Sequence, residues 1–214
     1  MFIVFEGIDG CGKTTQARRL SEWVGEKLGA GGVTLTHEPG GWLGGERVRD
    51  FILKGGISTR WGEFFAFMMD RCEHVERVIA PALARNRCVL CDRYVASTLA
   101  YQVFSDPETP EETAEYVARL HDVIGLPRPD CVCLLDLEPD IARVRLAARG
   151  KSNAFDYRVD DFFSRVRDGY DKIMRLSPDS WIKIDASRSE DEVFGDLTAE
   201  LETRFPSLLE RNPA

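Results

Sequence analysis

The chain has 214 residues with 36 acidic and 28 basic side chains, a formal charge of −8, and 43% of its residues are hydrophobic. This composition is typical of one globular domain with a sizeable core and excludes a disordered or fibrous chain. The acidic balance also argues against a nucleic-acid polymer as partner. No apolar run approaches the roughly 18 residues that span a bilayer, and no signal-peptide pattern opens the sequence. We therefore expect a cytoplasmic protein without a membrane partner.

The hydrophobic pattern predicts strands and helices in alternation. The expected strands are short apolar runs at 2–5, 33–36, 88–91, 131–135 and 181–184. The expected helices lie at 14–28, 46–53, 61–85, 111–124, 141–149, 162–176 and 190–201, with Pro81 as a candidate kink. Strands this apolar do not face water, so they indicate a parallel sheet with helices on both faces. No repeat or linker interrupts the pattern, so we expect a single α/β domain over residues 1–214.

Six cysteines include two close pairs, Cys88 with Cys91 and Cys131 with Cys133. Both pairs lie in apolar, strand-like runs, and the odd spacing of the first pair places its two thiols on opposite faces of a strand. We interpret these cysteines as small buried hydrophobic residues rather than as zinc ligands.

A glycine-rich segment follows the first predicted strand and precedes the first predicted helix. Residues 7–14 match G-x-x-x-x-G-K-[ST] in the context where that pattern binds phosphate. Its glycines let backbone N–H groups face phosphate oxygens, Lys13 reaches the β- and γ-phosphates, and the Thr14 hydroxyl ligates Mg²⁺. The predicted ATP-binding residues are Gly7, Ile8, Asp9, Gly10, Cys11, Gly12, Lys13, Thr14 and Thr15. ATPases, GTPases and kinases share this loop, so it leaves the reaction open.

Further segments, in order along the chain, resemble the thymidylate kinase family. They are residues 5–16, 38–41, 67–74, 92–102, 149–150 and 162–170. The resemblance implies an α/β P-loop NTPase fold with a five-stranded parallel sheet, helices on both faces and a short lid at about 148–160. The domain would be a nucleoside monophosphate kinase that phosphorylates dTMP to dTDP by direct in-line transfer. The resemblance also implies ATP, Mg²⁺ and a homodimer.

Two residues end the third predicted strand, at the sheet edge where open parallel sheets bind ligands. The resemblance assigns the first, Asp92, to the Mg²⁺ shell beside Thr14, and the second, Arg93, to the acceptor phosphate. An arginine suits that task because it forks two phosphate oxygens. A structural ion pair is the alternative interpretation of the two residues. Arg49, on a short predicted helix after the glycines at 40–41, is a second candidate for the acceptor phosphate.

The base and sugar of the acceptor also have candidate partners. Phe67 and Arg71 lie four residues apart and so share a helix face. By resemblance Phe67 stacks on thymine, Arg71 donates to its O4, and Asp9 approaches the sugar 3′-hydroxyl. A lone phenylalanine at this spacing would otherwise be read as part of the core. The remaining substrate-binding residues implied by the resemblance are Ser97, Thr98, Tyr101 and Gln102, with Tyr101 crowding a ribose 2′-hydroxyl.

The catalytic cations are expected to be Lys13, Arg93 and an arginine of the lid. In this family such an arginine comes from the lid or from the phosphate loop, and positions 8–11 here contain none. Arg149 is therefore the best candidate, with Lys151 and Arg158 behind it.

Two other functions remain open from the sequence. A kinase for another deoxynucleoside monophosphate or for a nucleoside would share most of these residues. A nucleoside hydroxyl needs a general base, and Glu38 is the only obvious candidate. A P-loop ATPase that acts as a switch is the third possibility.

Overall fold

The structure is a computed structural model that describes residues 1–29, 31–110, 112–150 and 161–206. Within these ranges the apolar runs form one sheet of five parallel strands in the order β2-β3-β1-β4-β5. The strands are β1 (Phe2–Glu6), β2 (Val33–His37), β3 (Cys88–Asp92), β4 (Cys131–Asp136) and β5 (Trp181–Asp185). The predicted five-stranded parallel sheet is therefore confirmed.

Each strand extends one residue beyond the apolar run that predicts it. The five added residues are all ionisable: Glu6, His37, Asp92, Asp136 and Asp185. The apolar run ends at the first ionisable side chain, but the backbone hydrogen bonds between the strands continue for one more residue. Because the strands are parallel, these five residues gather at one carboxyl edge, which is where open α/β sheets bind ligands.

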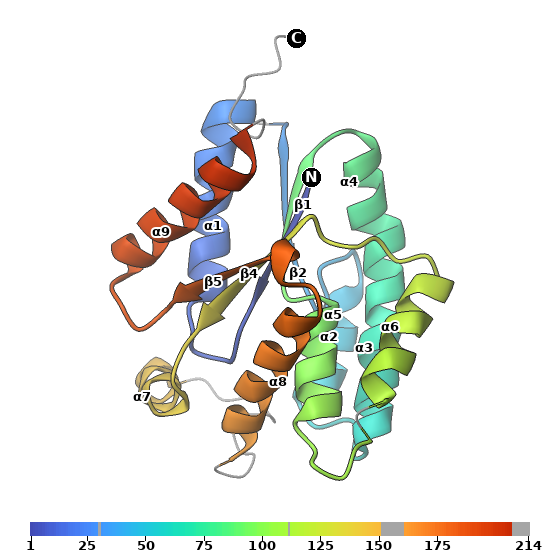
Figure 1. Ribbon diagram of the computed structural model, residues 1–214. Coiled ribbons are helices and arrows are strands. Elements are labelled where there is room, and N and C mark those ends of the chain that lie inside the picture. Colours follow the sequence, from blue (N-terminus) through green and yellow to red (C-terminus); the bar gives the residue numbers. More distant parts are fainter. Residues whose placement is uncertain (30, 111, 151–160, 207–214) are drawn as a thin grey trace.

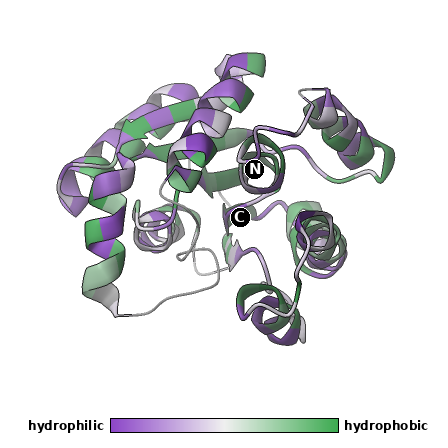
Figure 2. Cartoon of the chain, turned by 90° about the horizontal axis from the view of Figure 1, so that it is seen from below, coloured by the Kyte–Doolittle hydropathy of each residue, from purple (hydrophilic) through white to green (hydrophobic). Residues whose placement is uncertain are grey.

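Helices cover both faces of the sheet (Figure 1). Helices α1 (Lys13–Leu28) and α9 (Glu190–Arg204) lie side by side on one face. The other face carries α3 (Arg60–His74), α5 (Val95–Thr98), α6 (Thr113–Val123) and α8 (Phe162–Leu176). In Figure 2 the strands between these layers are mostly green, whereas the helices carry both colours, as amphipathic helices do. No helix within the described ranges is long and apolar enough to cross a membrane.

The long helical stretch predicted at 61–85 is confirmed but contains a π turn. Helix α3 begins after Thr59, whose hydroxyl accepts a hydrogen bond from the Gly62 amide at 3.1 Å. The π-helix η1 (Val75–Ile79) follows, and α4 (Ala80–Ala84) carries Pro81 in its first turn. Proline has no N–H to donate, and a π turn before it changes the hydrogen-bond ladder at that point.

Residues 95–104 form helix α5 and the π-helix η2 (Leu99–Phe104), which are absent from the predicted elements. Most of η2 is buried, including Gln102. A helix buried on all sides lacks the polar face that makes helical periodicity visible. Gly169 of α8 permits the close approach of η2, because a Cβ there would lie 2.8 Å from that of Phe104.

The remaining helices are short. Helix α2 (Gly45–Leu53) follows the glycine loop after β2, and α7 (Pro139–Arg149) follows β4. The 3₁₀ turn η3 (Pro178–Ser180) precedes β5. The paired cysteines of β3 and β4 are free and buried in the sheet.

Candidate active site

The phosphate loop connects β1 to α1 at the carboxyl edge of the sheet. Gly7, Gly10 and Gly12 have φ angles of 139°, 87° and 98°, a region that favours glycine. A Cβ on Gly7 would lie 2.5 Å from the Leu135 carbonyl oxygen, so this turn has no room for another residue. The Lys13 ammonium is buried and donates to the carbonyl oxygens of Gly7 at 3.0 Å and Ile8 at 2.9 Å.

Two adjoining pockets form one cleft at this edge. The first lies over the phosphate loop and is lined by Lys13, Thr14 and Asp92 among others. The second contains all nine predicted acceptor-side residues: Asp9, Arg49, Phe67, Arg71, Arg93, Ser97, Thr98, Tyr101 and Gln102. Asp9, Glu38, Arg49 and Arg93 line both pockets.

Arg93 lies at the junction of the two pockets and is held from several sides. Its guanidinium donates to Asp9 at 2.6 Å, to Ser97 at 3.0 Å and to the Gly7 carbonyl oxygen at 3.2 Å. The Tyr101 ring lies beneath it, 5.0 Å from Cζ to the ring centroid. The φ angle of Arg93 is 76°, an uncommon conformation for a residue with a side chain. Such strain is kept where surrounding contacts hold the residue.

Glu6 provides much of the support behind Arg93. Its carboxylate is fully buried and accepts hydrogen bonds from the Tyr94 and Ser97 amides at 2.9 and 3.1 Å. It also accepts from the Ser97 and Tyr170 hydroxyls at 2.6 and 2.9 Å. Burial raises the pKa of Glu6, although the hydrogen bond from Ser97 and the charge of Arg93 oppose the shift. Sequence reasoning missed this role, and the only signal was an acid that directly ends a buried strand.

Asp9 remains an acceptor at neutral pH. Burial alone would raise the pKa of Asp9, but the charges of Arg93 and Lys13 outweigh it, so the pKa lies below its ordinary value. The Tyr101 hydroxyl also lies within 3.4 Å of Asp9. A sugar hydroxyl in the second pocket would therefore meet an ionised carboxylate.

Two oxygen ligands for a hard cation meet above the phosphate loop. The Thr14 hydroxyl donates to Asp92 at 2.5 Å, although 78 residues separate the two in sequence. Hydroxyl and carboxylate oxygens beside a phosphate site suit Mg²⁺. The two predicted metal ligands are thus neighbours, and their chemistry fits the ion.

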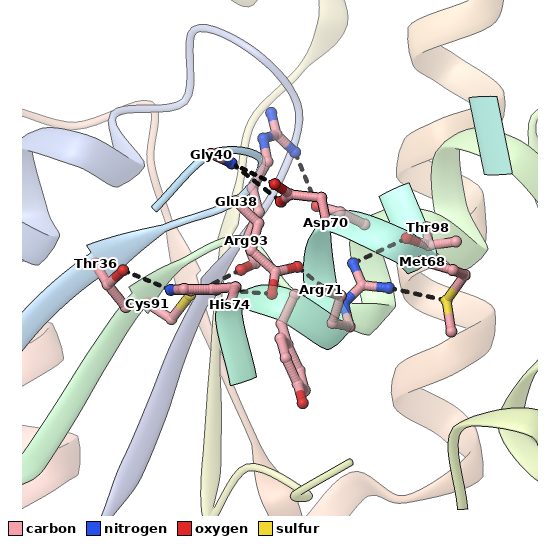
Figure 3. Close-up of polar contacts among 12 residues, drawn as sticks. Thr36, Glu38, Gly40, Met68, Asp70, Arg71, His74, Cys91, Arg93 and Thr98 are labelled. Carbon is pink, nitrogen blue, oxygen red and sulfur yellow. Dashed lines mark hydrogen bonds and ion pairs between the residues drawn. The ribbon is translucent and has the colours of Figure 1, made fainter. Parts of the chain in front are cut away.

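The base end of the second pocket contains a buried polar cluster (Figure 3). Both carboxylate oxygens of Glu38 are occupied: Oε2 accepts from Arg71 Nε at 2.8 Å, and Oε1 lies 3.0 Å from His74 Nδ1. Asp70 accepts from the Gly40 amide and from the Trp42 indole, which fixes the glycine loop after β2. Sequence reasoning treated Glu38 only as a possible base and missed His74 and Asp70.

The other predicted residues have distinct positions. Arg49 donates to the Pro39 carbonyl oxygen at 2.9 Å and lines both pockets. Gln102 is buried, and its Nε2 has no hydrogen-bond partner among the described residues, so it offers a donor at the pocket wall. The Ser97 hydroxyl is engaged with Glu6 and Arg93, so its contacts support the site from behind.

The predicted lid lies largely outside the described residues. Residue Arg149 ends helix α7, but its side chain is outside the described part, and so are Lys151 and Arg158. A further pocket, which sequence reasoning missed, borders the phosphate loop on the side of α9. It is lined by Gly10, Thr15, Arg145, Ala186, Arg188, Ser189 and Glu190 among others. Arg145 is fixed there because it donates to the Ala186 carbonyl oxygen at 2.9 Å.

Comparison with known proteins agrees with this geometry. The family model described as thymidylate kinase matches residues 5–197. The chain belongs to the thymidylate kinase family. Thymidylate kinases of Pelotomaculum thermopropionicum and Deinococcus radiodurans are 38% and 37% identical to it, over 99% and 95% of this chain and 97% of each relative. A crystal structure of thymidylate kinase from Ehrlichia chaffeensis matches with a TM-score of 0.77 at 31% identity, covering 94% of this chain and 98% of the other.

The predicted family and the P-loop NTPase fold are thereby confirmed. Membership of the thymidylate kinase family makes the chain a nucleoside monophosphate kinase, which is a phosphotransferase with small-molecule nucleotide substrates.

Proposed function

We propose that this member of the thymidylate kinase family transfers the γ-phosphoryl group of ATP directly to dTMP and forms dTDP. The observation that carries the proposal is that Asp9 and Arg93 line both halves of one cleft. A phosphate acceptor held by Arg93 would lie next to the phosphate loop. A phosphate monoester has a second pKa of about 6, so its oxygen is already mostly anionic at neutral pH and needs no general base. The site's main task is then to hold two polyanions in line.

The acceptor pocket has chemistry that matches each part of dTMP. Half-buried Phe67 offers a ring face to the base, and Arg71 offers donors to the O4 carbonyl oxygen. Thr98 and Gln102 complete the base side, where Gln102 Nε2, which has no partner in the described part of the chain, is a further donor. The pair formed by Asp9 and Tyr101 meets the sugar, where Tyr101 excludes a 2′-hydroxyl. Arg49 and Arg93 bind the acceptor phosphate, and Ser97 fixes Arg93.

The donor side binds ATP along the phosphate loop. Residues 7–15 surround its phosphates, with Lys13 on the β- and γ-phosphates, and Thr14 and Asp92 would hold Mg²⁺. Bound there, Mg²⁺ would neutralise charge on the phosphates. The adenine would occupy the pocket beside Arg145, Ala186 and Arg188, because that pocket is also lined by Gly10 and Gly12 of the phosphate loop.

The lid at about 148–160 would close the single domain over both nucleotides. We assign the lid cation to Arg149 because positions 8–11 of the phosphate loop contain no arginine and residue 149 ends α7, the helix that follows β4. Turnover of Arg149→Ala in the assay below tests this assignment, and unchanged turnover would move the role to Lys151 or Arg158.

The nucleoside alternative receives less support from the site. Its only candidate base, Glu38, has one carboxylate oxygen bonded to Arg71 and the other to His74. A general base must reach the proton it removes, and these oxygens face other donors. A phosphate acceptor therefore fits the pocket better than a nucleoside hydroxyl.

An acceptor screen decides among these functions. ATP consumption is measured with dTMP, dUMP, dCMP, dGMP and thymidine, with and without MgCl₂, and also without any acceptor. We expect efficient turnover with dTMP and Mg²⁺ and little without acceptor. Preference for thymidine would favour the nucleoside kinase, and acceptor-independent hydrolysis stimulated by a protein or by DNA would favour the ATPase switch.

We also propose a cytoplasmic homodimer without a nucleic-acid partner. Trp61, Phe65 and Met69 recur every four residues on α3 and form an exposed apolar stripe, with 42%, 63% and 47% of their surfaces exposed. Phe51 of the neighbouring α2 is also exposed. A second copy would cover this stripe.

Sedimentation velocity tests the dimer. The unsubstituted protein should sediment as a dimer of 24.1-kDa chains, whereas Phe65→Asp should sediment as a monomer. The control Val144→Asp, at a residue on α7 that is also exposed, should remain dimeric. A monomeric unsubstituted protein would contradict the proposal.

A further inference from the structure

Four side chains form a row beneath the base end of the acceptor pocket (Figure 3). The row runs from Arg71 through Glu38 and His74 to Thr36, and its members come from α3, from β2 and from the residue that follows β2. Arg71 Nε donates to Glu38 at 2.8 Å, His74 Nδ1 lies 3.0 Å from the other Glu38 oxygen, and His74 Nε2 lies 2.6 Å from the Thr36 hydroxyl. All four are at most 6% exposed.

The carboxylate of Glu38 fixes the roles of the other groups. A carboxylate paired with a guanidinium accepts only, so His74 Nδ1 must donate to it. His74 Nε2 lies 2.6 Å from the Thr36 hydroxyl, whose single hydrogen goes either to Nε2 of a neutral ring or to the Gly41 carbonyl oxygen at 3.3 Å. Burial alone would lower the pKa of Arg71, but the charge of Glu38 outweighs it and raises that pKa above the ordinary value.

Arg71 has N–H groups that its contacts in the row do not use, and these contacts fix the direction of the unused groups. Of its five N–H groups, Nε uses one on Glu38, Nη1 one on Met68 at 3.3 Å and Nη2 one on Thr98 at 3.0 Å. Within the part of the chain that the structure describes, one N–H on each terminal nitrogen remains for a ligand. A guanidinium is planar, so fixing its Nε fixes the direction of the other donors as well.

We propose that Glu38, His74 and Thr36 act as positioning residues that orient Arg71 toward a carbonyl oxygen and thereby select a base with an oxo rather than an amino group at ring position 4. The inference rests on the proposed function. An amino group in that place would direct its own N–H toward the donors of Arg71 and leave them unsatisfied. The row reaches β2 through Thr36, so the orientation is fixed by the sheet as well as by α3.

The test compares two acceptors that differ only at the edge of the base. dTMP and 5-methyl-dCMP share sugar, phosphate and methyl group, but 5-methyl-dCMP has an amino group at position 4 and no proton on N3. The readout is the ratio of kcat/KM for dTMP to that for 5-methyl-dCMP. A loss of folded protein would lower both values equally and leave the ratio unchanged.

Glu38→Gln is the first variant. A glutamine amide has one acceptor oxygen and no charge, so its NH₂ group faces either Arg71 Nε, donor against donor, or His74 Nδ1, which must then change tautomer, and the ion pair with Arg71 is lost in both cases. We expect the ratio to fall about tenfold, the worth of one lost oriented hydrogen bond. The fall should come mainly through a higher KM for dTMP, because Lys13 and Arg93 remain in place.

Thr36→Val keeps the proposal testable if Glu38→Gln fails to fold. It removes the far end of the row with little change of shape, and we expect the ratio to fall about threefold, less than a full hydrogen bond. Thr34→Val is the matched control on the same strand, because the Thr34 hydroxyl is buried and has no hydrogen-bond partner in residues 1–29, 31–110, 112–150 and 161–206. It should leave the ratio unchanged.

The outcomes separate the two proposals. The positioning role is overturned if the kcat/KM ratios of Glu38→Gln and Thr36→Val both lie within twofold of the ratio of Thr34→Val. It is also overturned if kcat/KM falls by the same factor for both acceptors. Failure of the unsubstituted protein to phosphorylate dTMP overturns the proposed function instead. In that event the ratio is measured for the best acceptor of the screen and its 4-amino or 4-oxo counterpart, and an unchanged ratio again overturns the positioning role.

Discussion

Replacing Lys13 with alanine is expected to lower kcat about 1000-fold, the upper range for losing one preorganised donor to a developing charge. Lys13 is buried in the cleft and presents its ammonium beside the phosphate loop. In the structure that ammonium donates to the carbonyl oxygens of Gly7 and Ile8, and a nucleotide phosphate would compete with these carbonyls for it. Steady-state turnover with ATP and dTMP measures the loss.

The control for this variant is Lys27→Ala, in the last turn of the same helix. Lys27 lies over the Trp23 ring and far along α1 from the cleft, so its loss should leave kcat within twofold. The two contacts of Lys13 with loop carbonyls limit the stability cost of Lys13→Ala to about 2 kcal/mol in the free energy of unfolding. A folded Lys13→Ala protein with normal kcat would contradict the assignment of the phosphate loop.

Arg93→Lys is expected to lower kcat about 100-fold although the charge is kept. The Arg93 guanidinium reaches Asp9, Ser97 and the Gly7 carbonyl oxygen together, and its plane lies over Tyr101. A lysine ammonium is a point charge that cannot make these contacts and also fork two phosphate oxygens. Turnover and the KM for dTMP should both be affected, because Arg93 lines both pockets.

Arg128→Lys is the matched substitution outside the cleft. Arg128 makes a forked contact with Asp122 at 2.6 and 2.8 Å, but the pair is exposed and contributes little to stability. Its kcat should be unchanged. If Arg93→Lys turned over as fast as Arg128→Lys, Arg93 would be a structural residue, the alternative that the sequence left open.

Much of the fold was predictable because its signals are local. The apolar runs at 2–5 and 131–135 are each long enough for a buried strand, and Gly10, Gly12 and Lys13 form a pattern with one well-known use. The prediction ends each strand one residue too early, and this difference has a physical reason. Hydrophobicity marks the buried part of a strand, whereas Glu6 and Asp92 continue the backbone ladder with ionisable side chains.

The partners of the buried polar groups were not predictable. Glu38 has nothing in its neighbourhood in sequence to indicate that Arg71, 33 residues away, and His74, 36 residues away, would occupy both its oxygens. Glu6 likewise meets Ser97 and Tyr170 only through the folded sheet. Such contacts depend on how α3, α5 and α8 pack on the strands, and no local pattern encodes that packing.

The sequence by itself determined the class of the protein: an α/β chain with a phosphate loop, a set of ordered family segments and acceptor-side residues that all line one pocket. Periodicity and motif spacing suffice for the α/β pattern and the phosphate loop because both act over a few residues, whereas the acceptor-side residues followed from the resemblance to the thymidylate kinase family. Only the tertiary structure decided which groups are free to react. It engages the Glu38 carboxylate and the Ser97 hydroxyl in contacts with other protein groups, and among the described residues it leaves Gln102 Nε2 and two N–H groups of Arg71 for a ligand. The reason is that a buried polar atom must find its partners wherever the packing brings them, and these partners come from distant elements.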